Sequence, residues 1–328
     1  MSQRKVTARS EIWPLAKPFT ISRGTKTKAE VLVVEIAEAG FVGRGECVPY
    51  AHYGETINEV QREVITQTPA IENDMTREAL WYVTVPGAAR NAIDAALWDL
   101  QAKIDGEPVW QLAEVPEPIT TLTAQTIGLG TAEAMGMAAS ELTAAPLIKV
   151  KLDAEAVVER MRAVREAAPD SRLIADANEA WDIALLNDVA PALANMGVEM
   201  IEQPLPAGQD EALVDYDSPV LLCADESCHI SDDLAVIRGM YGMINIKLDK
   251  SGGLTEALNL ARAARIADFK IMIGCMVGTS LGMAPAMMLA SFAEYVDLDG
   301  PLLLKDDRDN GLVFDNGWVR PPEPALWG

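Results

Sequence analysis

The chain has 328 residues, 49% of them hydrophobic, which is enough for about two domains or for one large α/β barrel with additions. Its 27 basic and 49 acidic residues give a net charge of −22, which argues against nucleic acids and anionic membranes as partners. Only two histidines, His52 and His229, are present, which excludes a three-histidine zinc site and an H-E-x-x-H helix. Any catalysis must therefore rest on carboxylates, lysines or an oxygen-bound metal.

The cysteines and the apolar segments bear on the compartment. The four cysteines form no close C-x-x-C pair and no disulfide framework, which favours a reducing, cytoplasmic setting. Residues 1–9 are basic but lead into no apolar segment typical of a signal peptide. No charge-free apolar run approaches 18 residues, so we expect no membrane span.

The first third of the chain predicts a small α+β domain. Segments 31–36 and 41–47 are β-rich runs on either side of a short turn, which predicts an antiparallel hairpin. Apolar residues recur at helical spacing over 87–103. Two prolines in 114–118 predict a linker, so we assign residues 1–115 to an N-terminal capping domain.

Residues 116–300 alternate short apolar runs with amphipathic segments. Seven of the eight runs are followed by a segment with helical character, and eight such units favour a closed barrel over a doubly wound sheet. We therefore predict a modified TIM barrel, (β/α)7β, and expect residues 301–328 to pack back on the capping domain. The eight predicted strands are 120–127, 147–151, 172–176, 198–202, 220–225, 243–247, 270–275 and 295–299.

The carboxyl end of each predicted strand carries a polar or reactive side chain. Their separations of 22 to 28 residues match the length of one βα unit. Because all strands of a barrel end at one face, where the active sites of such barrels are built, we expect these side chains to meet there. In chain order they are Thr126, Lys151, Asp176, Glu202, Asp225, Lys247, Cys275 and Asp297.

Three of these side chains, Asp176, Glu202 and Asp225, are carboxylates on consecutive strands. Converging carboxylates repel one another unless a cation neutralises them. Ligation by oxygen alone suits magnesium or manganese rather than zinc or copper. The pattern therefore predicts a divalent metal site at the barrel mouth.

Lysines flank this predicted metal site. Lys149 and Lys151 lie two residues apart on one strand and point to the same side, where mutual repulsion and burial are expected to lower their pKa values. A lysine with a lowered pKa can act as a general base, and Lys149 is interpreted as an electrostatic helper. Lys247 ends the sixth strand, almost opposite the second. Such a pair suits the removal of a proton alpha to a carboxylate and its return to the other face.

The motifs Lys149-Val-Lys151, Asp176-Ala-Asn178, Glu202-Gln-Pro204 and Asn245-Ile-Lys247 resemble those of the enolase superfamily, in particular its muconate-lactonizing subgroup. The resemblance covers essentially the whole chain. It implies a capped barrel, one Mg²⁺ per subunit with Mn²⁺ as a possible substitute, and Lys151 and Lys247 as the two acid–base residues. A homo-oligomer is compatible with the resemblance, and the sequence leaves the oligomeric state open.

Two acidic residues on the predicted eighth strand limit the range of substrates that we expect. Asp297-Leu-Asp299 resembles the D-x-D motif of dipeptide epimerases. In those enzymes the acid pair holds the substrate's ammonium group. The resemblance implies epimerisation of L-Ala-D-Glu and L-Ala-L-Glu, dipeptides of murein, with Thr126, Lys149 and Cys275 lining the pocket. In the basic loop 22–28, Arg23 is the candidate for binding a distal carboxylate, and Lys26 and Lys28 are interpreted as solvated.

Three alternatives remain open. An o-succinylbenzoate synthase-type lyase or a cycloisomerase of the same subgroup would use the same metal and lysines but has little use for Asp297 and Asp299. A non-catalytic barrel that binds peptides needs no base on each face of its ligand.

Overall fold

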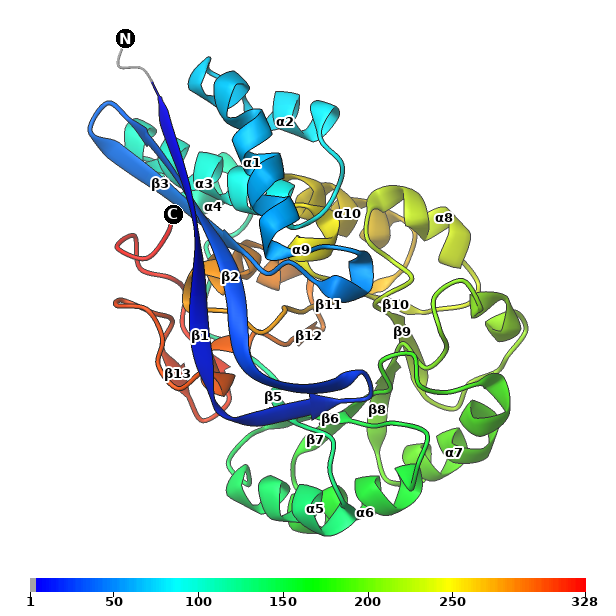
Figure 1. Ribbon diagram of the computed structural model, residues 1–328. Helices are drawn as coiled ribbons and strands as arrows, with labels where there is room; N and C mark the ends of the chain where they lie inside the picture. Colours follow the sequence, from blue (N-terminus) through cyan, green and yellow to red (C-terminus); the bar gives the residue numbers. More distant parts are fainter. Residues whose placement is uncertain (1–3) are drawn as a thin grey trace.

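The computed structural model describes residues 4–328 and shows an N-terminal domain set against one side of a barrel (Figure 1). Three antiparallel strands, in the order β1-β2-β3, form the sheet of the N-terminal domain. The predicted hairpin corresponds to β2 (Gly24–Glu38) and β3 (Phe41–Cys47). Sequence analysis missed β1 (Lys5–Ile21), because it buries only Leu15 and a register shift interrupts its pairing between Pro14 and Phe19.

Helices cover one face of this sheet. The predicted helix over 87–103 is α3 (Ala88–Asp105), which packs directly on β3. A Cβ atom at Gly43 or Gly45 would lie 2.1 or 2.0 Å from a backbone oxygen of α3, so only glycine permits this close approach. The other helical elements of the domain are η1 (Ala51–Tyr53), α1 (Ile57–Glu72), α2 (Arg77–Val83) and α4 (Val109–Leu112).

Eight parallel strands, in sequence order from β5 to β12, form the barrel. The backbone N–H of Ala124 donates to the carbonyl oxygen of Val296 at 2.8 Å and joins the first strand segment to the last. One buried cluster takes a residue from each strand or its edge: Ala124, Leu147, Ile174, Met200, Cys223, Met243, Met272 and Tyr295. The predicted barrel is therefore confirmed. Its strands are β5 (Gln125–Ile127), β6 (Leu147–Lys151), β7 (Arg172–Asp176), β8 (Val198–Glu202), β9 (Leu221–Ala224), β10 (Met243–Ile246), β11 (Lys270–Ile273) and β12 (Tyr295–Val296).

The connections differ from the predicted helices after the fourth and fifth strands. After β8 there is only the 3-10 helix η2 (Asp210–Leu213), because segment 203–219 contains three prolines and no apolar periodicity. After β9 the chain forms η3 (Ser231–Asp233) and the four-residue α8 (Leu234–Ile237). The remaining connections are α5 (Ala132–Glu141), α6 (Val157–Ala167), α7 (Ile183–Asn195), α9 (Leu248–Ser251), α10 (Leu254–Ile266), α11 (Ser280–Met283) and η4 (Ala284–Phe292).

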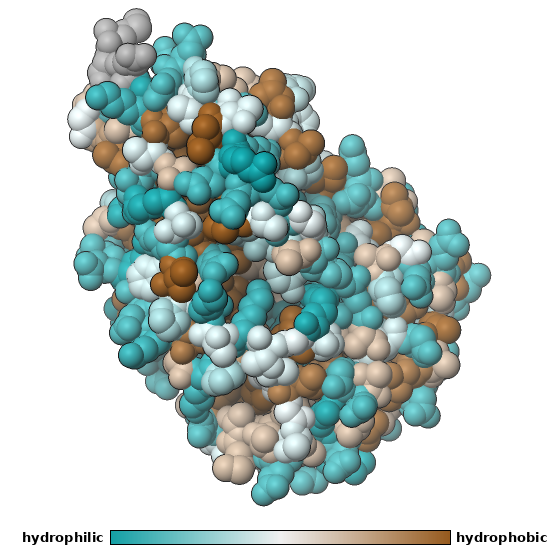
Figure 2. Space-filling view, viewed as in Figure 1, coloured by the Kyte–Doolittle hydropathy of each residue, from teal (hydrophilic) through white to brown (hydrophobic). Residues whose placement is uncertain are grey.

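The last segment runs from the barrel to the N-terminal domain. After η5 (Gly300–Leu303), strands β13 (Phe314–Asp315) and β14 (Trp318–Val319) pair with the short β4 (Thr121–Leu122). At the C-terminal end, Trp327 Nε1 donates to the carbonyl oxygen of Ala95 in α3 at 3.0 Å. The face seen in Figure 2 is mostly polar, with hydrophobic side chains scattered over it. Within residues 4–328, no helix has the length and apolarity that crossing a bilayer requires.

A buried carboxylate joins the two domains. Asp249 Oδ1, in α9, accepts hydrogen bonds from the backbone N–H of Val48 at 3.0 Å and from Asn91 Nδ2 at 2.9 Å. Burial, together with the nearby carboxylates Glu55 and Glu46, outweighs these hydrogen bonds and raises the pKa of Asp249 to about 7.

We expect Asp249→Asn to stabilise the protein in a pH-dependent way. The unfolded chain releases this proton near pH 4, whereas the folded protein keeps it to about pH 7, so stability falls as pH rises between these values. The neutral amide removes this penalty, with a gain of up to roughly 4 kcal/mol above pH 7. Urea unfolding at pH 5 and pH 8 should show the larger gain at pH 8. A gain that is equal at both values would contradict the assignment.

Candidate active site

The predicted carboxylates and lysines come together because neighbouring strands end in register. Lys151 lies opposite Asp176 across the β6–β7 pair, and Asp176 lies opposite Glu202 across the β7–β8 pair. Asp225 directly follows β9. The three carboxylates are almost completely buried, with exposed fractions of 0 to 1%. The barrel mouth therefore holds concentrated negative charge away from solvent.

Lysine ammonium groups lie between these carboxylates. Lys151 Nζ is 2.5 Å from Asp176 Oδ2, and Lys247 Nζ is 2.5 Å from Asp225 Oδ2. Lys149 Nζ lies 2.7 Å from Glu202 Oε2 and 3.2 Å from Asp176 Oδ2, and so bridges two of the acids.

The expected lowering of the lysine pKa is wrong for Lys149. Burial by itself lowers this pKa, but attraction to Asp297 and two further carboxylates outweighs it and holds the pKa well above its ordinary value. Lys247 behaves in the same way, with Asp225 as its main partner. Conversely, the lysines hold the pKa of Asp176 and of Asp225 below the ordinary range although burial raises it. At Lys149, attraction to the carboxylates therefore outweighs the effect of burial.

The donor set fits a hard divalent cation. Glu202 Oε2 and Asp225 Oδ1 are buried and accept no hydrogen bond of normal geometry within residues 4–328. Each is approached instead by a lysine ammonium, at 2.7 Å from Lys149 and 2.8 Å from Lys250. In that same part of the chain, no group of three acidic, histidine or cysteine side chains is arranged to hold a metal ion. A divalent ion would compete with the ammonium groups for oxygen ligands of the kind that Mg²⁺ prefers.

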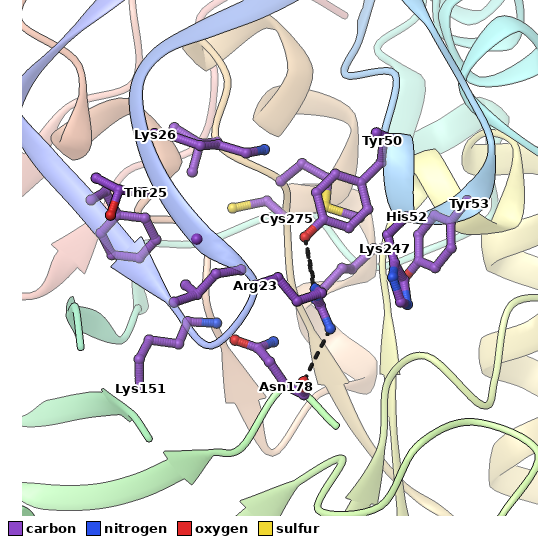
Figure 3. A pocket seen from close by; sticks show the side chains of 16 residues that line it. Arg23, Thr25, Lys26, Tyr50, His52, Tyr53, Lys151, Asn178, Lys247 and Cys275 are labelled. Carbon is purple, nitrogen blue, oxygen red and sulfur yellow. Dashed lines mark hydrogen bonds between the residues drawn. The ribbon is translucent and has the colours of Figure 1, made fainter. Parts of the chain in front are cut away.

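A cavity of about 570 Å³ lies between the barrel mouth and two loops of the N-terminal domain (Figure 3). Lys151 and Lys247 line it from the barrel, together with Cys275. The tip of the β1–β2 hairpin and the loop around η1 cover it. The residues that these two loops contribute are Ile21, Arg23, Gly24, Thr25, Lys26, Tyr50, Ala51, His52 and Tyr53.

The predicted acid pair is buried beside this cavity. Asp297 and Asp299 are each 5% exposed. Asp297 Oδ2 pairs with Lys149 Nζ at 2.8 Å, and Asp297 Oδ1 has no hydrogen-bond partner among the described residues. Asp299 Oδ2 accepts the backbone N–H of Thr126 at 2.6 Å, and burial and the charge of Asp297 raise the pKa of Asp299 to about 7. Thr126 and Asp299 line a second cavity of about 420 Å³, which shares Phe19 with the first.

Arg23 lines the cavity, but its guanidinium already has protein partners. Its Nη1 lies 3.0 Å from Glu179 Oε2 and its Nη2 lies 2.8 Å from Glu226 Oε1. It also donates to the hydroxyl of Tyr50 at 3.2 Å and to the carbonyl oxygen of Asn178 at 3.2 Å (Figure 3). Arg23 thus ties the hairpin tip to the barrel. The interpretation of loop lysines as solvated holds for Lys28 but is wrong for Lys26, which lines the cavity.

Three further polar residues of the site are not among the candidates from the sequence. Lys250 Nζ, fully buried, pairs with Asp225 Oδ1 at 2.8 Å, and Asn245 Nδ2 donates to Glu202 Oε1 at 2.7 Å. Asn245 lies two residues before Lys247, a spacing that signals the same strand face. Glu226 follows Asp225, and burial and the charge of Asp225 raise its pKa to about 8.

The capped barrel and its ring of carboxylates and lysines define an enolase-type enzyme. Residues 3–113 match the N-terminal domain model of the mandelate racemase and muconate lactonizing enzymes, and residues 131–325 match the enolase C-terminal domain-like model. The chain therefore belongs to the enolase superfamily, and the resemblance found in its sequence is confirmed.

Two of its curated relatives are an L-Ala-D/L-Glu epimerase and an N-acetyl-D-glutamate racemase. The chain is 46% identical over 316 residues to the L-Ala-D/L-Glu epimerase of Escherichia coli K12, covering 96% of this chain and 98% of the relative. It is also 46% identical over 300 residues to an N-acetyl-D-glutamate racemase of a Pseudoalteromonas species, covering 91% of this chain and 95% of the relative.

Two solved structures similar to this chain contain bound ligands. An enolase family member from Agrobacterium tumefaciens with homology to dipeptide epimerases, solved with sodium and L-Ala-L-Glu, has a TM-score of 0.97 and 46% identity, covering 99% of this chain and 100% of its own. The dipeptide epimerase of Enterococcus faecalis, solved with magnesium and L-Leu-L-Tyr, has a TM-score of 0.91 and 29% identity, with 98% of both chains covered.

Proposed function

We propose that this protein epimerises L-Ala-D-Glu and L-Ala-L-Glu by moving the α-proton of the C-terminal residue. One observation carries the proposal: two lysines from opposite sides of the barrel line the same cavity. Lys151 ends β6 and Lys247 follows β10, and three strands separate β6 from β10 in the ring of eight. A substrate held between them offers one face of its α-carbon to each lysine.

In the proposed reaction, one lysine as a neutral amine removes the α-proton and the other, as an ammonium, returns a proton to the opposite face. Carboxylates hold the pKa of Lys247 high, and the neutral form would become accessible when a divalent ion competes for those carboxylates. Asp176, Glu202 and Asp225 would hold Mg²⁺, with Mn²⁺ as a possible substitute. When bound, the ion would supply positive charge for the substrate carboxylate and for the negative charge that develops on it. Lys149, held charged by its carboxylate partners, adds positive charge beneath the same site. The two loops over the cavity exclude water from the carbanionic species.

The acid pair supports a substrate with a free ammonium group. Asp297 Oδ1 is a buried oxygen without a hydrogen-bond partner in the described part of the chain, and an ammonium group would provide the missing donor. A lyase or cycloisomerase of the same subgroup needs no such acid pair, and a peptide-binding barrel needs no opposed lysines. An N-acetylated glutamate carries no ammonium group, so the pair favours the dipeptide over the acylated amino acid.

The remaining assignments complete the proposal. Thr126 and Cys275 would border the substrate, and the hairpin tip that carries Arg23 and Lys26 would face its side chain. Acting on a murein-derived dipeptide of this kind, the enzyme would work in the cytoplasm, in the degradation and recycling of cell-wall peptides. The substrate is a small molecule, and neither nucleic acid nor membrane enters the proposal; a homo-oligomer is compatible with it.

Deuterium exchange tests the proposal directly. The protein is incubated with Mg²⁺ and L-Ala-L-Glu in D₂O, and proton NMR should show loss of the glutamyl α-proton signal as the D-epimer accumulates. N-acetyl-D-glutamate serves as the second substrate, and slower turnover is expected for it. Absence of exchange with a panel of dipeptides would refute the epimerase assignment, and faster turnover of N-acetyl-D-glutamate would favour the racemase activity.

A further inference from the structure

Lys26 stands out among the cations of the cavity because its charge is unmatched. It lies near the tip of the β1–β2 hairpin and extends over the cavity (Figure 3). Its Nζ lies 4.7 Å from the centre of the Tyr50 ring, and within residues 4–328 it makes no ion pair and no hydrogen bond. Burial, and then the charge of Arg23, lower the pKa of Lys26. A half-buried ammonium with only an aromatic face beside it is an incomplete arrangement.

Arg23, the candidate from the sequence, is in the opposite situation. Two carboxylates, Glu179 and Glu226, flank its guanidinium, and a hydroxyl and a backbone carbonyl accept its remaining hydrogen bonds. The same Glu179 also lies 2.7 Å from Nε2 of His52 in the second covering loop. Arg23 and Glu179 therefore connect both loops to the barrel, and a substrate carboxylate could reach Arg23 only by displacing one of these partners.

We propose that Lys26 is the specificity-determining residue that binds the side-chain carboxylate of the dipeptide's acidic residue, while Arg23 fixes the hairpin tip on the barrel. This inference rests on the proposed function, since it assumes that the dipeptide occupies the cavity between Lys151 and Lys247. Complementary charges then lie at separate places: the buried acid pair Asp297 and Asp299 beside the cavity for the ammonium group, and Lys26 on the cavity wall for the side chain. A substrate carboxylate at Lys26 would also give its ammonium group the ion-pair partner that the described part of the protein does not provide.

Lys28 offers a matched control on the same strand. It is exposed, two residues from Lys26, and already paired with Glu30 at 2.6 Å. The variants Lys26→Met, Lys26→Arg, Lys28→Met and Arg23→Met are compared with the wild type on L-Ala-L-Glu and on the isosteric, uncharged L-Ala-L-Gln. Initial rates with Mg²⁺ give kcat and KM, and calorimetry gives the Kd of each dipeptide. Circular dichroism and thermal unfolding show whether each variant is folded.

We expect Lys26→Met to lower kcat/KM for L-Ala-L-Glu by about 10- to 100-fold, mainly through KM, and to leave L-Ala-L-Gln within about threefold. Lys26→Arg should keep most of the discrimination, and Lys28→Met all of it. Arg23→Met should impair both substrates alike, because it loosens the covering loops.

Three results would overturn the inference: equal losses on both dipeptides for Lys26→Met, unchanged discrimination in that variant, or selective loss of L-Ala-L-Glu in Arg23→Met. If the wild type turns over neither dipeptide, the proposed function fails. The Kd values then test separately whether Lys26 binds the side-chain carboxylate. Tighter binding of L-Ala-L-Glu than of L-Ala-L-Gln that is lost only in Lys26→Met would still support its role.

Discussion

Replacing either Lys151 or Lys247 by alanine is expected to lower kcat for epimerisation by roughly 10²- to 10⁴-fold or more, because each lysine serves one face of the α-carbon. Both line the same cavity, and each contacts a different buried carboxylate, Asp176 or Asp225. Neither lysine can take over from the other, since the strands that carry them lie on opposite sides of the barrel.

Single-epimer exchange separates the roles of the two lysines. In D₂O with Mg²⁺, each variant should still exchange the α-proton of one epimer only, and the two variants should differ in which epimer that is. Lys270→Ala is the control, because Lys270 is exposed and begins β11 at the other end of the barrel. Full epimerase activity in either site variant would contradict the two-face mechanism.

Asp225→Asn is expected to remove activity and to destabilise the fold. The carboxylate pairs with two buried lysines, at 2.5 Å with Lys247 and 2.8 Å with Lys250, and its loss leaves both charges short of a partner. Breaking a buried pair in this way costs about 3–5 kcal/mol of unfolding free energy. The same change removes one proposed Mg²⁺ ligand, so the affinity for the ion should fall as well.

These two effects are measured separately. Urea unfolding in the presence of a chelator reports the loss of the lysine partner, and calorimetric titration with Mg²⁺ reports the loss of the ligand. Asp188→Asn, an exposed position on α7, is the control for removing one negative charge. Unchanged Mg²⁺ affinity in Asp225→Asn would refute its assignment to the metal site.

The barrel could be predicted because its strands are short, apolar and separated by a regular period. Strands buried on both faces show this pattern in the sequence. Strand β1 lacks it, because its side chains are largely exposed or half-buried and only its pairing with β2 defines it. A helix was also expected after β8, because strands and helices alternate in such barrels. The three prolines in this segment were the local signal against that helix.

The residue types of the site were also present in the sequence. Carboxylates and lysines at strand ends must converge in a barrel, so the spacing of Lys151, Asp176 and Glu202 was enough to group them. Their protonation could not be predicted, because it depends on distances. Lys149 has three carboxylates within 3.2 Å, and these reverse the effect of burial on its pKa.

The sequence by itself therefore determined the capped barrel, the superfamily and the charged residues at the barrel mouth, because each depends on local period and residue type. Only the tertiary structure decided which cation of the hairpin tip is free to meet a ligand. Arg23 pairs with Glu179 and Glu226, which lie just after β7 and β9, far from Arg23 along the chain. No local sequence pattern links these carboxylates to Arg23. Their contacts satisfy Arg23 and leave the charge of Lys26 open to the cavity.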